Sequence, residues 1–121
     1  MLRTEPLVRH GDDRGVLLKV HPSPVSGEVY VVTARPGQAR GHHFHRHMAE
    51  WFVAVSGQGE LRAQDPETGR TSRVDLAGIR VHVPAGIAHV LVNTGTQDLV
   101  VVACAERCHD PSDVVPWPVP L

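Results

Sequence analysis

Histidines concentrate in one short stretch of the chain. Nine of the 121 residues are histidine, and four of these lie within six positions, at His42, His43, His45 and His47. Side chains alternate between the two faces of a β-strand, so on a strand His43 and His45 point the same way, about 7 Å apart along the chain. Two such imidazoles can reach a single ion, because metal–nitrogen bonds are about 2 Å long. His42 points to the opposite face and receives no role.

A carboxylate and a distant histidine extend this candidate site. Glu50 follows His45 by five residues and is close enough to supply an oxygen ligand if the chain turns near His47. Such a turn leaves His47 in solvent or beside the ligands. His89 would have to come from a strand far along the sequence, which a closed β-barrel makes feasible.

The elements that position these residues are predicted to be strands. Eleven glycines and 10 prolines leave few windows for a helix of ten residues. Eight β-branched stretches separated by turn residues remain: Val16–His21, Glu28–Ala34, Glu50–Ser56, Glu60–Asp65, Ser72–Leu76, Arg80–Val83, His89–Asn93 and Leu99–Ala105. This spacing predicts one all-β domain over residues 1–121, an antiparallel sandwich or barrel. Residues 111–121 are predicted to form an extended, proline-rich tail in which Trp117 docks on the barrel or on a partner subunit.

Composition excludes several classes of protein. With a net charge of −1, the chain has no strong positive field that would attract nucleic acid or an anionic membrane. The longest apolar run, Leu99–Ala105, is far shorter than the 18 or so residues of a membrane span, and Met1–Pro6 carries no apolar signal core, so we expect a cytoplasmic protein. Cys104 and Cys108 are too few for a disulfide framework and are expected to be reduced thiols.

Ten positions around the histidines form two spaced patterns. The first pattern runs Gly37, five residues, His43, one, His45, four, Glu50, six, Gly57. The second pattern runs Gly78, five residues, Pro84, one, Gly86, two, His89, three, Asn93. At roughly one chance in twenty per position, both patterns in order are not a coincidence. In these spacings the sequence resembles the cupin superfamily, whose two signature motifs they match without a gap.

The cupin resemblance implies a fold and a metal site. The implied fold is a small antiparallel β-barrel of the jelly-roll, or double-stranded β-helix, type. The implied ligands are His43, His45, Glu50 and His89, which leave one or two coordination positions for water or substrate. We expect a divalent transition metal, namely zinc, iron, manganese, nickel or cobalt, with zinc slightly favoured.

Three further stretches narrow the resemblance: Asp12–Gly15 before the first predicted strand, Arg40–His43 at the first motif, and Glu106–Pro111 after the last predicted strand. They are similar to the nucleotide-sugar cupins: the dTDP-dehydrorhamnose 3,5-epimerases, the dTDP-sugar ketoisomerases and, most closely, the C-terminal cupin domain of capsular-polysaccharide enzymes that epimerise UDP-4-hexulose sugars. The residues that carry this similarity are Asp12, Arg14 and Gly15; Arg40, Gly41, His43 and His45; and Glu106, Asp110 and Pro111.

The resemblance implies an isomerase, an epimerase acting on a nucleotide-linked 4-keto sugar by removing the proton beside the ketone. Because Lys19 is the only lysine, we expect Arg14, Arg40 and Arg46 to hold the diphosphate. If a metal is bound, His43 is a ligand, and Tyr30 and His82 are the candidate proton-transfer groups; if none is bound, His43 is itself the candidate base.

Two alternatives remain open at this stage. The same ligands suit an iron-dependent dioxygenase acting on a small substrate, and a cupin barrel can also bind a small ligand without catalysis. A homodimer is expected in each case, because short barrels leave apolar sheet edges that pairing covers.

Overall fold

The computed structural model describes all of residues 1–121 and is almost entirely β-structure. The only helical element is a 3₁₀ turn, η1 (Pro111–Asp113). The strands are β1 (Arg3–Pro6), β2 (Val8–Asp12), β3 (Gly15–Lys19), β4 (Val29–Ala34), β5 (Ala39–His45), β6 (Glu50–Ser56), β7 (Gly59–Gln64), β8 (Thr71–Asp75), β9 (Ile79–Val83), β10 (Ala88–Asn93), β11 (Leu99–Ala105) and β12 (Val114–Pro116). The chain contains no helix with the length and hydropathy that a membrane span requires.

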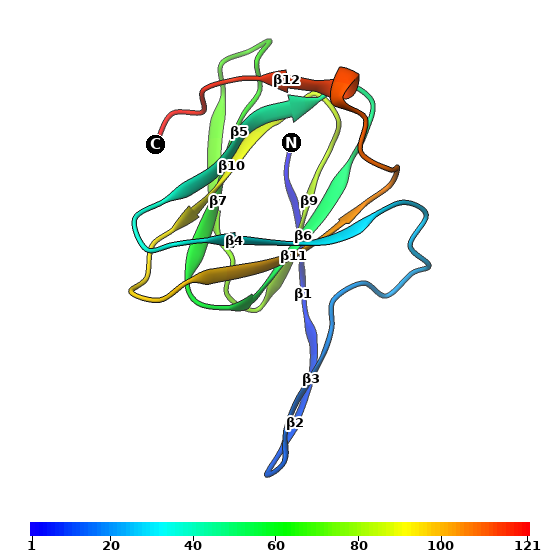
Figure 1. Cartoon of the computed structure of the whole chain (residues 1–121), viewed down its shortest axis with the longest axis vertical. Helices are drawn as coiled ribbons and strands as arrows, with labels where there is room; N and C mark the ends of the chain where they lie inside the picture. The colour runs from blue at the N-terminus through cyan, green and yellow to red at the C-terminus, as the bar shows by residue number, and fades with distance from the viewer.

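Ten of the strands form two five-stranded antiparallel sheets that face each other (Figure 1). One sheet has the order β1-β9-β6-β11-β4, and the other has the order β12-β5-β10-β7-β8. Neighbours such as β4 and β11 are far apart in sequence, as a jelly-roll barrel requires. The expected all-β antiparallel cupin fold is therefore confirmed.

Alternation along the strands places an apolar core between the sheets. On β7, Leu61 and Ala63 are buried while their neighbours are partly exposed. Leu76 and Leu99 complete the tightly packed part of the core. The core extends to Phe52 on β6, whose ring centroid lies 5.4 Å from that of His89. The apolar core therefore directly adjoins the histidines.

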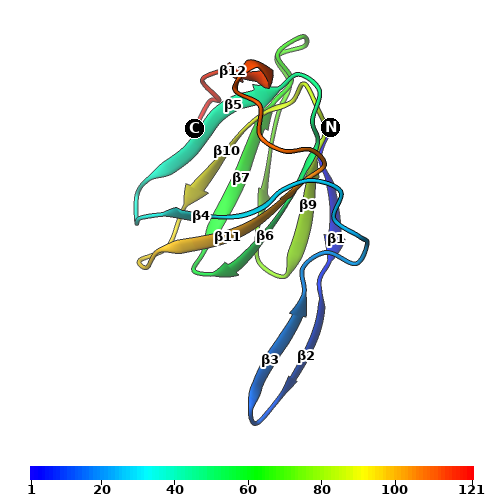
Figure 2. The ribbon, with the colours of Figure 1, turned by 45° about the vertical axis from the view of Figure 1, so that its right-hand side comes forward.

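The remaining two strands form a separate β-hairpin. β2 and β3 pair only with each other, and their ribbon extends away from the barrel (Figure 2). The segment after β11 returns to the barrel instead. There η1 interrupts the predicted extended tail, and β12 adds to the edge of β5. Trp117 then docks on the barrel, as predicted: its indole N–H donates to Gln64 Oε1 at 2.9 Å and its ring packs against Phe44.

Candidate metal centre and its cavity

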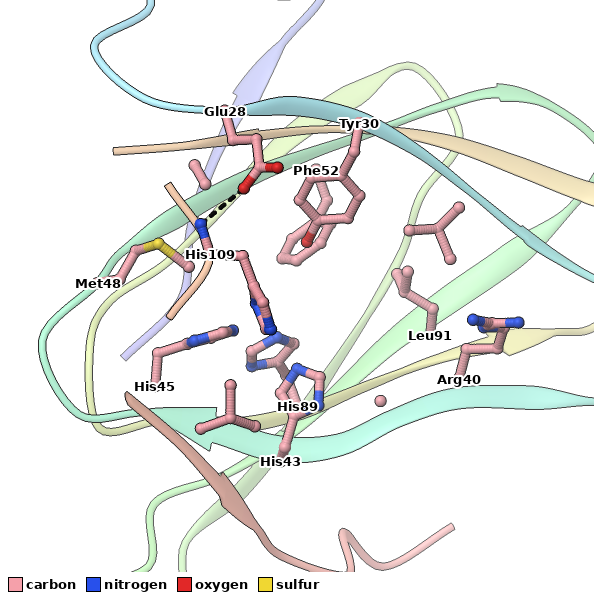
Figure 3. A pocket seen from close by; sticks show the side chains of 14 residues that line it. Glu28, Tyr30, Arg40, His43, His45, Met48, Phe52, His89, Leu91 and His109 are labelled. Atoms are coloured by element: carbon pink, nitrogen blue, oxygen red, sulfur yellow. Dashed lines mark hydrogen bonds between the residues drawn. The ribbon is translucent and has the colours of Figure 1, made fainter. Parts of the chain in front are cut away.

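Three imidazoles converge inside the barrel (Figure 3). His43 and His45 lie on the same face of β5, and His89 lies opposite His43 on the adjacent strand β10. The ring centroid of His43 lies 5.1 Å from those of both His45 and His89. One ring nitrogen from each of the three lies within 4.8 Å of the others. Two neighbouring strands of one sheet therefore bring these three histidines together, as the sequence predicted.

Glu50 approaches the histidines from the other sheet. It begins β6, its side chain is 1% exposed, and its Oε1 lies 2.8 Å from His45 Nε2. The Tyr30 hydroxyl donates a hydrogen bond to Glu50 Oε2. Oε1 itself accepts no aligned hydrogen bond, because the approach of His45 has the distance of one but not the direction. A buried carboxylate oxygen is thereby left free to bind a cation.

The buried carboxylate shifts the pKa values of its neighbours. Burial would raise the pKa of Glu50, but the close approach of His45 and the hydrogen bond from Tyr30 outweigh burial and hold the pKa below its usual value. Burial would likewise lower the pKa of His45, but Glu50 and Asp113 outweigh it and raise the pKa. Burial, together with the charge of Glu50, raises the pKa of Tyr30 far above its ordinary value. Tyr30 therefore stays protonated and bonded to Glu50.

The other two imidazoles are held neutral. Burial, with smaller contributions from His89 and His45, lowers the pKa of His43 to about 4. Burial also lowers the pKa of His89, whose Nδ1 lies 3.0 Å from the Ile87 carbonyl oxygen. A proton on Nδ1 donated to that carbonyl leaves Nε2 as the ring's lone-pair nitrogen.

These features fit a divalent transition metal. Imidazoles ligate such ions when neutral and carboxylates when ionised, and the pKa shifts of His43, His89 and Glu50 favour these states. His45 would lose its proton on binding the ion. The three ring nitrogens already lie close together. His43, His45, His89 and Glu50 are the residues that would hold the ion.

A cavity of about 480 Å³ opens above this cluster. Strand β4 supplies Tyr30 and Val32 to its lining, and Arg40 lies exposed at its rim. Arg40 and Tyr30 are therefore two predicted functional residues that the fold brings to the cavity.

The other three predicted residues lie elsewhere in this chain. His82 alternates with the buried Val81 and Val83, so it faces away from the core and packs against Trp51 at 4.6 Å; the expectation that it lies near the cavity is wrong. Arg46 is exposed beyond the end of β5 and does not line the cavity. Arg14, at the hairpin tip, pairs with Asp12 at 2.7 Å, and its part in substrate binding stays a prediction.

Sequence reasoning missed three residues of the site. Asp113 is buried, lies 3.4 Å from His45 Nδ1 and accepts the His47 backbone N–H at 2.8 Å. Glu28 and His109 line the cavity and are joined, because the His109 backbone N–H donates to Glu28 Oε1 at 2.7 Å. The resemblance already marked Glu106, Asp110 and Pro111, and that stretch was the available signal for Asp113 and His109.

A cupin-like barrel with a histidine and carboxylate cluster facing its cavity is thus the class that fold and site define. Residues 10–114 match the family model described as the polysaccharide biosynthesis C-terminal domain. The chain belongs to this family, and the resemblance to nucleotide-sugar cupins is confirmed.

Individual relatives agree with this assignment. The chain is 30% identical over 104 residues to a UDP-2-acetamido-2,6-beta-L-arabino-hexul-4-ose reductase from Pseudomonas aeruginosa, a match that covers 84% of this chain and 28% of the relative. It therefore spans less than a third of that protein. The capsular polysaccharide assembling protein CapF from Staphylococcus aureus is 29% identical, with a TM-score of 0.73 over 94% of this chain and 35% of the other.

Two further solved structures share the fold at lower identity. A dTDP sugar isomerase from Desulfovibrio desulfuricans has a TM-score of 0.89 at 18% identity, covering 97% of this chain and 83% of its own. ChmJ, a 3'-monoepimerase from Streptomyces bikiniensis in complex with dTDP-quinovose, has a TM-score of 0.85 at 22% identity. This match covers 95% of our chain and 68% of ChmJ.

Proposed function

We propose that this domain binds a divalent transition metal and acts as an epimerase or isomerase on a nucleotide-linked 4-keto sugar. The observation that carries the proposal is the convergence of His43, His45 and His89 beside Glu50, at the base of an open cavity. The names of the relatives support a nucleotide-sugar substrate, because they specify a UDP-linked hexul-4-ose, a dTDP sugar and dTDP-quinovose.

The cavity suits the sugar end of such a molecule. Its volume of about 480 Å³ is of the size that encloses a small-molecule ligand. Arg40 at the rim offers a fixed positive charge for a diphosphate, with donors that match phosphate oxygens. A nucleotide sugar would enter sugar first, with its phosphates at Arg40.

The chemistry needs two groups. A base removes the proton from the carbon beside the ketone, and the electron pair of that C–H bond moves to the ketone oxygen; a proton is then returned to the carbon. A divalent ion bound in the site would supply Lewis-acid polarisation of the ketone. Among the chain's own residues, the Tyr30 hydroxyl keeps the Glu50 carboxylate oriented toward the histidines.

Hydrogen exchange tests the proposal directly. In deuterated water, a UDP- or dTDP-4-keto sugar should gain deuterium beside the ketone in the presence of the zinc-loaded protein, as measured by mass spectrometry. His43→Ala and His89→Ala should reduce the exchange at least hundredfold. His47→Ala is the matched control, because its side chain is exposed in the same segment and only its backbone contacts Asp113. No exchange across several such sugars would contradict the proposed activity.

The donor set also supports a second candidate. Three histidines and a glutamate bind iron(II) as well as zinc, so an iron-dependent dioxygenase is the alternative. Anaerobic loading with iron(II), followed by oxygen and a panel of small substrates, separates the two candidates. Oxygen uptake coupled to substrate loss would favour the dioxygenase, and we expect none.

A further inference from the structure

The proposed reaction requires a base, and most titratable groups of the cavity already have partners. His43, His45 and His89 turn ring nitrogens toward one centre. The Tyr30 hydroxyl donates to Glu50, and the pKa of that phenol is far too high for it to act as a base near neutral pH. With a metal in the proposed site, none of these five side chains is free to accept a proton from substrate.

His109 is the imidazole of the cavity that remains. It lines the cavity, yet it stands outside the group of three histidines whose ring nitrogens converge. Figure 3 shows its side chain reaching into the cavity from the segment that follows β11. The residue is exposed, so substrate entering the cavity would meet its ring.

The backbone around His109 is held on both sides. Its own N–H donates to Glu28 Oε1 at 2.7 Å, which ties the segment to the residue before β4. Asp110, the next residue, caps η1 and accepts hydrogen bonds from the Ser112 N–H at 3.0 Å and the Ser112 hydroxyl at 2.8 Å. The attachment of this imidazole is therefore fixed, while its ring is left without a protein partner, as a proton-transfer group requires.

We infer that His109 is the base of the proposed reaction, so the inference depends on the proposed function. A neutral His109 ring nitrogen takes the proton from the carbon beside the ketone. The C–H electron pair becomes the carbon–carbon double bond of an enolate, whose negative charge lies on the former ketone oxygen. Water then delivers a proton to the opposite face of that carbon, which regenerates the ketone with inverted configuration. The imidazolium gives its proton to the hydroxide so formed, which restores the neutral ring.

Substitution of His109 separates catalysis from structure. His109→Ala keeps the backbone N–H that binds Glu28, so the variant should fold with an unchanged melting temperature and an unchanged zinc stoichiometry. We expect its rate of deuterium incorporation beside the ketone to fall at least hundredfold. Arg107→Ala, an exposed position in the same segment, should leave the rate within twofold of wild type.

Chemical rescue supplies the decisive readout. Because position 109 is exposed at the cavity, added imidazole can enter the space that the alanine vacates, and it should restore exchange in proportion to its concentration. Exchange by His109→Ala at the wild-type rate would overturn the inference. So would a loss that imidazole does not rescue, since that points to a structural role. Failure of the proposed function is distinguishable, because then the wild-type protein itself exchanges no proton.

Discussion

His45 differs from the other two histidines of the cluster in the direction of its pKa shift. Burial opposes protonation at all three, but at His45 the carboxylates of Glu50 and Asp113 outweigh burial and raise the pKa. The pKa of His43 is lowered to about 4, and that of His89 is also lowered. At a pH where the metal-free cluster carries a proton, that proton therefore lies on His45.

Metal binding should release this proton, because a coordinated imidazole nitrogen is deprotonated. We expect release of up to one proton per zinc ion near neutral pH, and an affinity that rises with pH until His45 is neutral in the free protein. Calorimetry in buffers of different ionisation enthalpy measures the release. A binding enthalpy independent of the buffer would contradict this assignment of charge.

Asp113 should support the metal without ligating it. Its Oδ2 lies 3.4 Å from His45 Nδ1, and its Oδ1 accepts the His47 N–H. Loss of such a partner typically weakens metal binding about 10- to 100-fold. We predict this loss for Asp113→Ala and a smaller one for Asp113→Asn, which keeps an acceptor for the His47 N–H. Competition with a chromogenic chelator measures both, and equal affinity in wild type and Asp113→Ala would refute the role.

At the scale of the elements, the strands with a clear apolar pattern were predictable. All eight predicted stretches are strands, with ends shifted by a residue or two, because β-branched residues between turn residues leave few other conformations. β1, β2 and β12 were not predicted. β1 and β2 are exposed throughout, and β12 has only three residues, so no alternation marks them. For β5, a strand was inferred only around His43 and His45, because the polar sequence of this segment has no alternation of apolar residues.

Two motif glycines provide a matched test of the turns between strands. Gly57, between β6 and β7, has φ +82°, and a Cβ there would lie 2.3 Å from the Asp98 carbonyl oxygen. Gly86, between β9 and β10, has φ +85° with no atom within 4 Å of such a Cβ. In Gly86→Ala the only strain is that of the left-handed backbone, which should lower the free energy of unfolding by about 1 kcal/mol. Gly57→Ala adds a steric clash with the Asp98 carbonyl and should lower the free energy of unfolding by about 4 kcal/mol or more.

Urea denaturation followed by circular dichroism measures both changes. The two variants share the same substitution and nearly the same φ, so the difference between them isolates the steric contact with Asp98. Equal destabilisation of the two would show that the contact is relieved by movement of the strand that begins at Leu99.

At the scale of the whole molecule, sequence spacing located the four proposed metal ligands but not the cavity around them. His43, His45, Glu50 and His89 are fixed by motif positions that the barrel topology brings together. His109 and Glu28 meet because the chain after β11 passes beside the start of β4, a contact between residues 81 positions apart. No local pattern encodes such a contact. His82 was placed wrongly because the direction of its side chain depends on which face of β9 meets the core.

The hairpin of β2 and β3 is the part of the molecule that lacks an intrachain partner. In the hairpin, Leu17 pairs with His10 and the adjacent Val16 pairs with Gly11. Because adjacent residues of a strand point to opposite faces, each face of the hairpin carries an apolar side chain. Val8, Val16 and Leu17 are about half exposed, at 48%, 53% and 54%. Strand β4 forms a free edge of its sheet, and Val29 and Val31 on its outer side are 54% and 63% exposed. An isolated hairpin is marginally stable, and a free edge invites pairing.

We therefore expect a homodimer in which the hairpin of each copy covers the outer side of β4 in the other. The double substitution Val16→Lys and Leu17→Lys should convert the dimer to a monomer, because it places charge on both hairpin faces, whereas Thr68→Lys in the exposed β7–β8 turn should not. Light scattering after size-exclusion chromatography measures the mass. Zinc stoichiometry should stay unchanged in the monomer, since all four proposed ligands belong to one chain. A wild-type protein that is already monomeric at working concentration would contradict this arrangement.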